Sequence, residues 1–177
     1  MHTSNVVAAW IASGHDRLQE GMQSVGVDAR ELAALTLVAT HDGCSVEWLR
    51  QRIRLTQSGT VRLVDRLGDR GLAQRGTSTG RGVPLHLTTA GQERLAQWHH
   101  TRERVVDALL TGVPAQQRPM LVDLLATALQ AEERLRPQAD ATCRTCSWPE
   151  CGQDCPVDRS VPDPAGRVAD PARSAPE

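Results

Sequence analysis

Four cysteines near the C-terminus are the residues whose type and spacing most clearly suggest chemistry. They lie in the segment 143-CRTCSWPECGQDC-155, which has the pattern C-x2-C-x4-C-x3-C. Thiolates two or three residues apart can bind one tetrahedral ion, and Pro149 and Gly152 can form the turns between them. The spacing therefore predicts a Zn²⁺ site whose ligands are Cys143, Cys146, Cys151 and Cys155.

Other interpretations of this cysteine cluster stay open. Two of the thiols could form a reversible disulfide and sense oxidants, because Arg144 could lower the pKa of a neighbouring thiol. The dipeptide Cys155-Pro156 resembles the end of a bacterial ferredoxin motif, but that motif has two residues between its middle cysteines and this chain has four, so an iron–sulfur cluster fits less well. The segment could also be an inert tail. The fifth cysteine, Cys44, lies alone and is predicted to be structural.

A second segment, 56-TQSGTVRLVDRLGDRG-71, combines the apolar spacing of a helix with a polar first turn. At about 100° per residue, one face carries Thr60, Leu63, Val64 and Leu67, and the opposite face carries Ser58, Arg62, Asp65, Arg66 and Asp69. We therefore expect a half-buried helix. Thr56 would cap its start, and Gly71 would end it in a left-handed conformation.

The charge of the chain is unevenly distributed around this helix. The net charge of the whole chain is −1, and all of its basic residues are arginine. From Ser45 to Gly91, eight arginines stand against three acidic residues, so this segment alone is strongly positive. A basic segment between acidic flanks predicts a confined contact with an anionic partner.

Apolar periodicity predicts the elements on either side of this segment. We expect helices over residues 5–24, 28–43, 45–53, 56–71, 89–109 and 114–135, with Asp28 capping the second and a capping box of Thr89 and Gln92 opening the fifth. Alternation predicts strands over 72–75 and 83–88, joined by 76-GTSTGRG-82. The fold class is thus mainly α with a small β-hairpin wing: a winged helix-turn-helix plus dimerisation helices.

A winged helix-turn-helix can place its second helix in the major groove of DNA. Short polar side chains in the first turn of that helix can contact base edges, whereas arginines at its ends and on the wing can contact phosphates or the minor groove. The predicted DNA-contacting residues are Arg54, Gln57, Ser58, Thr60, Arg62, Arg66, Arg75 and Arg81.

The segments 61-VRLVDRLGDRGLAQR-75 and 81-RGVPLHLTTAG-91 resemble the recognition helix and the wing of MarR-family transcriptional regulators. The resemblance implies a homodimer in which the first, fifth and sixth helices intertwine, and which binds a pseudo-palindromic operator in double-stranded DNA. It also implies a repressor that a small-molecule effector would release. The cysteine cluster suggests thiol or metal chemistry as another way to release it.

The domain organisation follows from these elements. Residues 1–136 form the MarR-like domain, with a DNA-binding lobe over 28–91 and dimerisation helices over 5–24 and 92–136. A knuckle-like cysteine segment covers 137–155, and the proline-rich residues 156–177 are predicted to be disordered.

The remaining expectations concern activity and location. No nucleophile–base pair, phosphate-binding loop or carboxylate dyad is recognisable, so the protein is not predicted to be an enzyme. The alternative function is single-stranded RNA binding by a zinc knuckle, with Trp148 as a stacking platform. The chain has no long apolar run and no signal peptide, so we expect a cytoplasmic protein without membrane contact.

Overall fold

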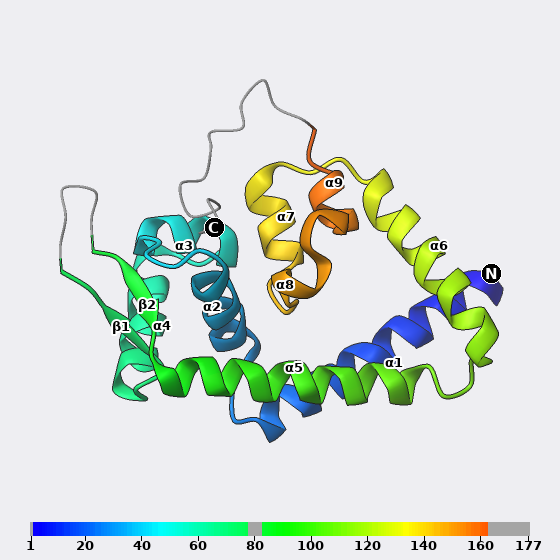
Figure 1. The fold of residues 1–177 in the computed structure, drawn as a ribbon, viewed down its shortest axis with the longest axis horizontal. Coiled ribbons are helices and arrows are strands. Elements are labelled where there is room, and N and C mark those ends of the chain that lie inside the picture. The colour runs from blue at the N-terminus through cyan, green and yellow to red at the C-terminus, as the bar shows by residue number, and fades with distance from the viewer. Residues whose placement is uncertain (1, 78–82, 163–177) are drawn as a thin grey trace.

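The structure is a computed structural model of the 177-residue chain and describes residues 2–77 and 83–162. Figure 1 shows the long helix α5 running along one side of the molecule, with the other elements placed along it. The elements are α1 (His2–Ser24), α2 (Ala29–Thr40), α3 (Val46–Ile53), α4 (Gln57–Asp69), β1 (Ala73–Arg75), β2 (Leu85–Leu87), α5 (Thr89–Leu109), the 3-10 turn η1 (Ala115–Gln117), α6 (Arg118–Ala131), α7 (Arg136–Thr142), α8 (Trp148–Cys151), the 3-10 turn η2 (Gly152–Asp154) and α9 (Pro156–Arg159). The predicted fold class is confirmed.

Side-chain caps fix where the helices of the lobe begin. Asp28 and Glu31 form a capping box at the start of α2, and the Thr56 hydroxyl accepts the backbone N–H of Gly59 at the start of α4. Gly71 follows α4 with φ +66°, the left-handed conformation expected there. The capping box predicted at Thr89 is wrong: Thr88 caps α5 by accepting the N–H of Gly91.

The lobe packs α2, α3 and α4 against the short wing sheet. β1 and β2 are antiparallel with Ala73 opposite Leu87, and an isolated bridge from Ser45 to Pro84 ties the wing to the start of α3. The side chains that α2, α3, α4 and β2 bury completely or almost completely are Leu32, Leu35, Val38, Leu49, Thr60, Leu63, Leu67 and Leu85. Because this core fixes both helices of the helix-turn-helix, the outward face of α4 has a defined orientation.

A buried carboxylate joins α4 to α2. Glu31 is 4% exposed and accepts hydrogen bonds from Arg66 (2.9 Å) and Arg70 (2.6 Å). Burial alone would raise the pKa of Glu31, but the bonds from Arg70, the Asp28 backbone and Arg66 together hold this pKa below its usual value. This charge-assisted network ties α4 to the start of α2.

Helix α5 begins next to the wing of the lobe and extends away from it, and along its length it packs against α1. Gly21 of α1 lies against Thr101 and Trp98, because a side chain there would meet the Thr101 methyl at 3.3 Å. The outer faces of these helices and of α6 expose a large set of apolar side chains: Val6, Val7, Trp10, Ile11, Val106, Met120, Val122, Leu124, Leu125 and Leu129. None of the described helices is long and apolar enough to cross a lipid bilayer.

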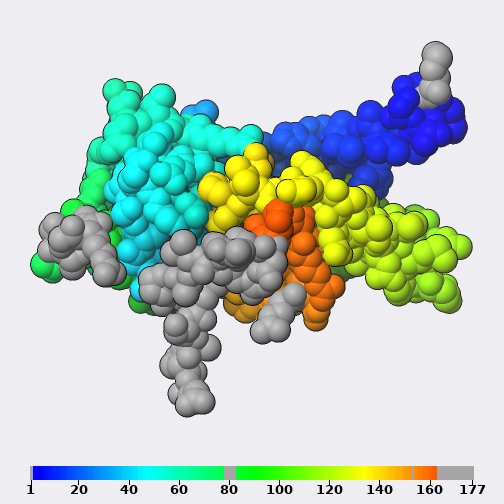
Figure 2. Space-filling view, turned by 90° about the horizontal axis from the view of Figure 1, so that it is seen from above, coloured from blue at the N-terminus to red at the C-terminus, as the bar shows by residue number. Residues whose placement is uncertain are grey.

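Residues 134–162, called here the C-terminal unit, fold between the lobe and α6 (Figure 2). Its small core contains Ala139, Cys155 and Val157. The predicted disorder boundary at residue 155 therefore needs correction, because α9 follows it and buries Val157, while Arg134 binds Ser160 at 3.0 Å. Residues 163–177 lie outside the described part of the chain.

Candidate functional site

The exposed face of the helix-turn-helix carries the first candidate site. Arg54 ends α3 with φ 53°, and Gln57, Ser58 and Arg62 follow on α4. All four side chains are exposed. Within the described part of the chain, Arg54 and Arg62 take part in no ion pair, so their charges are available to an anionic ligand.

The other predicted DNA-contacting residues are placed differently. Thr60 is fully buried and its hydroxyl donates to the Thr56 carbonyl at 3.0 Å, so we remove it from the DNA-contacting set. Arg66 binds Glu31 and Asp28, and Arg75 forms a 2.7 Å ion pair with Asp65, which leaves both partly neutralised.

Arg81 lies outside the described residues. The structure therefore brings Arg54, Gln57, Ser58 and Arg62 together on one surface, with Arg66 and Arg75 beside them in ion pairs.

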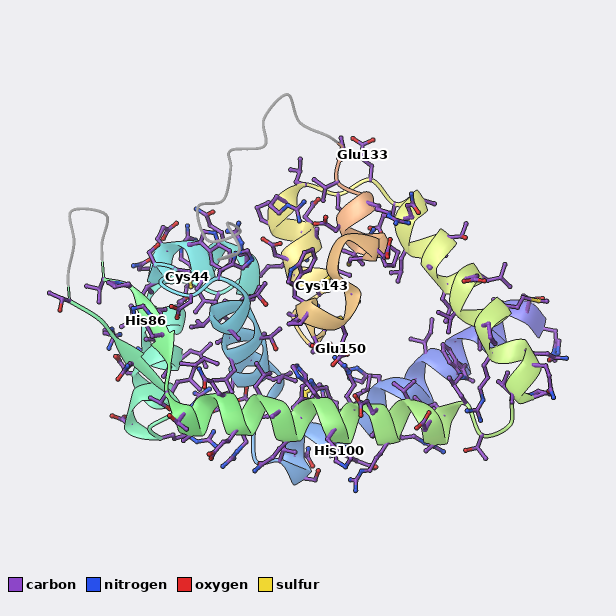
Figure 3. All side chains as sticks on the ribbon, viewed as in Figure 1. Cys44, His86, His100, Glu133, Cys143 and Glu150 are labelled. Atoms are coloured by element: carbon purple, nitrogen blue, oxygen red, sulfur yellow. The ribbon has the colours of Figure 1, made fainter. Side chains whose placement is uncertain are left out.

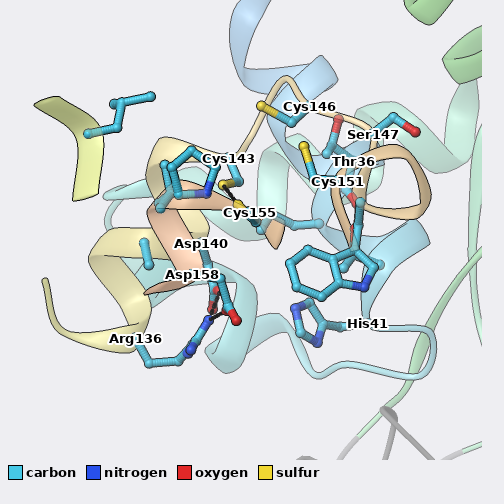
Figure 4. Close-up of a pocket in the computed structure, with 17 residues that line it drawn as sticks. Thr36, His41, Arg136, Asp140, Cys143, Cys146, Ser147, Cys151, Cys155 and Asp158 are labelled. Atoms are coloured by element: carbon cyan, nitrogen blue, oxygen red, sulfur yellow. Dashed lines mark hydrogen bonds and ion pairs between the residues drawn. The ribbon is translucent and has the colours of Figure 1, made fainter. Parts of the chain in front are cut away.

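The four clustered cysteines all line one cavity of about 180 Å³ between the C-terminal unit and α2 (Figure 4). Most of its wall is apolar, with Leu37, Trp148 and Val157 among the contributing residues. Cys155 is buried, Cys143 and Cys146 are half-buried, and Cys151 is exposed. Sequence spacing grouped these four cysteines, but it could not show that α2 of the lobe forms part of the cavity wall.

The four cysteines line the same cavity, but their side chains are not arranged around one point. Cys143 and Cys155 have their sulfur atoms 3.9 Å apart. Across residues 2–77 and 83–162, no three His, Cys, Asp or Glu side chains are arranged as a set that could hold a metal ion. The Zn²⁺ site of Cys143, Cys146, Cys151 and Cys155 stays a prediction; binding would need side-chain rotations that bring the four thiolates around the ion.

The thiols differ in acidity. A hydrogen bond from the Cys143 thiol, helped by the charges of Arg102 and Arg144, outweighs burial and lowers the pKa of Cys146 to about 7. The same hydrogen bond, together with burial and the nearby Cys155, raises the pKa of Cys143 far above its usual value. Burial also raises the pKa of Cys151. Of these three thiols, Cys146 is the one whose surroundings favour the thiolate.

Polar contacts that the sequence did not reveal join the C-terminal unit to the rest of the chain. Arg52 on α3 forms a buried 2.7 Å ion pair with Asp140 on α7, and its guanidinium lies 3.6 Å from the centre of the Trp48 ring. On α5, the indole N–H of Trp98 (3.1 Å) and Arg102 (3.2 Å) both donate to the Thr145 carbonyl. Arg52 and Asp140 are 88 residues apart, so no local pattern could have paired them.

Arg102 makes one further contact with the unit, an ion pair with Glu150 at 2.8 Å. Figure 3 shows Glu150 on the side of the unit that faces α5, with Cys143 above it and Cys44 away in the lobe. Ion pairs and hydrogen bonds thus join the C-terminal unit to the helix-turn-helix on one side and to α5 on the other.

A helix-turn-helix followed by a two-stranded wing, with long helices on either side, defines the class of winged helix proteins. Residues 25–82 match the model of the MarR family. The matched range covers the helix-turn-helix and the first strand of the wing, and the cysteine-containing C-terminal segment lies outside it.

Individual proteins are similar to the chain over a longer range. The chain is 27% identical over 103 residues to the uncharacterized HTH-type transcriptional regulator YdgJ of Bacillus subtilis, a match that covers 57% of this chain and 63% of the relative. Among solved structures, YusO from Bacillus subtilis is similar with a TM-score of 0.65 and 20% identity, covering 73% of this chain and 94% of YusO. Apo wild-type MarR from E. coli is similar with a TM-score of 0.60 and 20% identity, covering 71% and 96% of the two chains. These structural matches show the shared fold.

Proposed function

We propose that the protein is a transcriptional regulator that binds double-stranded DNA through α3, α4 and the wing. The observation that carries this proposal is the exposed surface of Arg54, Gln57, Ser58 and Arg62 on a rigidly packed helix-turn-helix. Arginines there can bind phosphates, and the amide and hydroxyl of the first turn can reach base edges. YdgJ, named as an HTH-type transcriptional regulator, supports the same function.

We further propose that the protein acts as a homodimer on a pseudo-palindromic operator. Support comes from the apolar side chains that α1 and α6 leave exposed, among them Ile11, Leu124 and Leu125. Several large apolar side chains exposed on the same helices are usually covered by a partner, and a second copy would cover them with two-fold symmetry. Helix α5 contributes less to this surface than the resemblance implies, because Leu95 and Trp98 are buried within their own chain.

The DNA surface can be tested with one charged residue and a matched control. Arg62→Ala should weaken binding to all duplexes and lower the slope of log affinity against log salt by about one unit per chain, because one phosphate contact is lost. Arg104→Ala removes an exposed arginine of α5 that lies outside this surface and should leave affinity unchanged. Equal effects of the two substitutions would contradict the proposed surface.

The same binding assay addresses base readout and the RNA alternative. Gln57→Ala should change the preferred bases more than it changes the affinity for random DNA.

Trp148 is half-buried against the cavity rather than presented as an open stacking surface. Binding of single-stranded RNA in preference to duplex DNA, lost in Trp148→Ala, would replace the proposed function with the RNA-binding one.

Relief of repression by a small effector stays a prediction. The resemblance places such a ligand in the crevice between the lobe and the dimerisation helices. In this chain the C-terminal unit lies between the lobe and α6, and the cavity it leaves there is lined by cysteines. The added unit is therefore the part of the molecule best placed to regulate the lobe.

A further inference from the structure

The C-terminal unit has a very small apolar core for the number of helices it holds. Its helices α7, α8 and α9 have seven, four and four residues, and helices this short are not stable without other contacts. The buried core of the unit consists of Ala139, Cys155 and Val157. Segments with so little buried apolar surface usually depend on disulfides or metal ions. The cysteines of the unit can supply such a cross-link.

Two of these cysteines lie at the ends of the first and the last helix of the unit. Cys143 caps the end of α7, Cys155 precedes α9, and their sulfur atoms are 3.9 Å apart. Two thiolates bound to one tetrahedral Zn²⁺, each about 2.3 Å from the ion, lie about 3.8 Å from each other. The pair therefore already has the separation of two ligands of a single ion.

The other two cysteines can complete a tetrahedral site. Cys146 and Cys151 line the same cavity as the pair (Figure 4). A turn brings Cys146 back toward Cys143, since the N–H of Cys146 donates to the Cys143 carbonyl at 2.9 Å. Cys146 is half-buried and Cys151 is exposed, so both side chains can rotate toward the pair without unpacking the buried core. This rotation is the rearrangement that binding by four ligands requires.

The segment that carries these cysteines also holds the unit against the rest of the chain. Asp140 of α7 forms the buried ion pair with Arg52 of α3. Thr145, in the turn between the first two cysteines, offers the carbonyl that Trp98 and Arg102 of α5 both bind. Both contacts require α7 and this turn to keep their conformation. An ion that fixes the four cysteines would therefore also fix the contacts with α3 and α5.

We propose that the four clustered cysteines bind one Zn²⁺ as thiolates, and that this ion keeps the C-terminal unit in the conformation that docks on α3 and α5. The ligands are Cys143, Cys146, Cys151 and Cys155. Each thiol releases its proton to solvent as its sulfur binds the ion, and no electron is transferred. The proposal goes beyond the proposed DNA binding and does not depend on it.

The test measures the metal content and the amide exchange of the full chain, purified under reducing conditions without chelator. Such protein should contain about one zinc per chain. Removing the zinc with a chelator should speed amide exchange over residues 134–162 by at least about tenfold, while the core of the lobe keeps its protection. Added Zn²⁺ should restore slow exchange. Co²⁺ in place of zinc should give the visible spectrum of a tetrahedral thiolate site.

Serine variants assign the ligands. Cys151→Ser should weaken zinc binding by at least about tenfold, because even the outer partners of metal ligands contribute that much. Since Cys151 is exposed, this loss cannot come from unpacking the core. Cys143→Ser and Cys155→Ser should weaken binding as well. Cys44→Ser is the matched control: Cys44 packs against the core of the lobe, and the variant should bind zinc as the unmodified chain does.

Several outcomes would overturn the proposal. A chain that is metal-free as purified and binds neither added Zn²⁺ nor added Co²⁺ would remove the site. Iron with inorganic sulfide, or a disulfide between Cys143 and Cys155 in protein kept reduced, would assign the cysteines to another chemistry. Zinc removal without a change in exchange over residues 134–162 would overturn the role in docking. None of these measurements uses DNA, so failure of the protein to select a duplex would overturn the proposed function alone.

Discussion

The helix-turn-helix lobe and the C-terminal unit lie side by side, but each is held together by different interactions. The lobe has a continuous apolar core to which α2, α3, α4 and the wing all contribute. The C-terminal unit has a small apolar cluster and depends on polar contacts such as Arg52 with Asp140 and Arg134 with Ser160. A region with few buried apolar groups opens at lower free energy than its surroundings. The unit is therefore suited to change state while the lobe stays folded.

The largest expected effect on stability comes from a side chain that contacts both regions. Trp98 fills the main core and donates to Thr145 of the C-terminal unit. Trp98→Ala should reduce the free energy of unfolding of the whole chain by about 3–5 kcal/mol, as large aromatic truncations in cores do. Urea unfolding followed by circular dichroism would measure this.

Trp148→Ala provides the comparison, since Trp148 is half-buried within the C-terminal unit. It should loosen that unit, seen as faster amide exchange over residues 134–162, and leave most of the helical unfolding transition in place. Equal loss of stability in the two tryptophan variants would mean that the regions form one cooperative unit, contrary to the comparison above.

The second prediction concerns the exposed apolar faces outside both regions. Ile11 on α1 is 59% exposed. Ile11→Asp would place a charge in the proposed dimer interface, where an unpaired carboxylate costs several kcal/mol, and should yield monomers that bind DNA weakly. Leu135→Asp, at a residue 69% exposed in the linker to α7, should stay dimeric. Sedimentation at micromolar concentration distinguishes these cases, and a monomeric unmodified chain would reject the interface.

The third prediction concerns pH and the lobe. The pKa of Glu31 is lowered in the folded chain, so its contribution to stability is present above its ordinary value of 4.5 and is lost as pH falls through the lower, folded value. Glu31→Gln should cost about 2 kcal/mol at pH 7, the size of hydrogen bonds to a charged group. The difference from the unmodified chain should shrink as pH falls below 4.5 and through the lower, folded pKa.

The control for this experiment is Glu47→Gln. Glu47 also has a lowered pKa, from hydrogen bonds with Arg50 and Gln51, but this pair is exposed to solvent. Its substitution should leave stability almost unchanged at every pH. A stability difference for Glu31→Gln that stays constant down to pH 3 would show that the charge of Glu31 is unimportant.

Local features of the sequence were sufficient to predict the helices of the lobe. The caps at Asp28 and Thr56 and the left-handed Gly71 are short-range features, and apolar periodicity placed α2 and α4 correctly. Thr60 shows the limit of this reasoning. Its residue type suited a base contact, but its position on the apolar face decided its burial.

The C-terminal unit was harder to predict because its contacts are long-range. Cysteine spacing located the cluster, but the pairing of Asp140 with Arg52 and of Thr145 with Trp98 and Arg102 depends on how distant segments meet in space. The proline content after residue 155 suggested disorder, whereas α9 begins with one of those prolines at its first position, where proline is well tolerated.

Selection of duplexes from a random pool by the reduced, full-length chain tests the central claim, that two copies of α4 read double-stranded DNA. The enriched sequences should contain two half-sites related by two-fold symmetry, with centres about one helical turn apart or a multiple of it. Arg62→Ala should bind the selected duplex more weakly than the unmodified chain does. Failure to enrich any duplex, or enrichment of a single asymmetric site bound by one chain, would contradict the account.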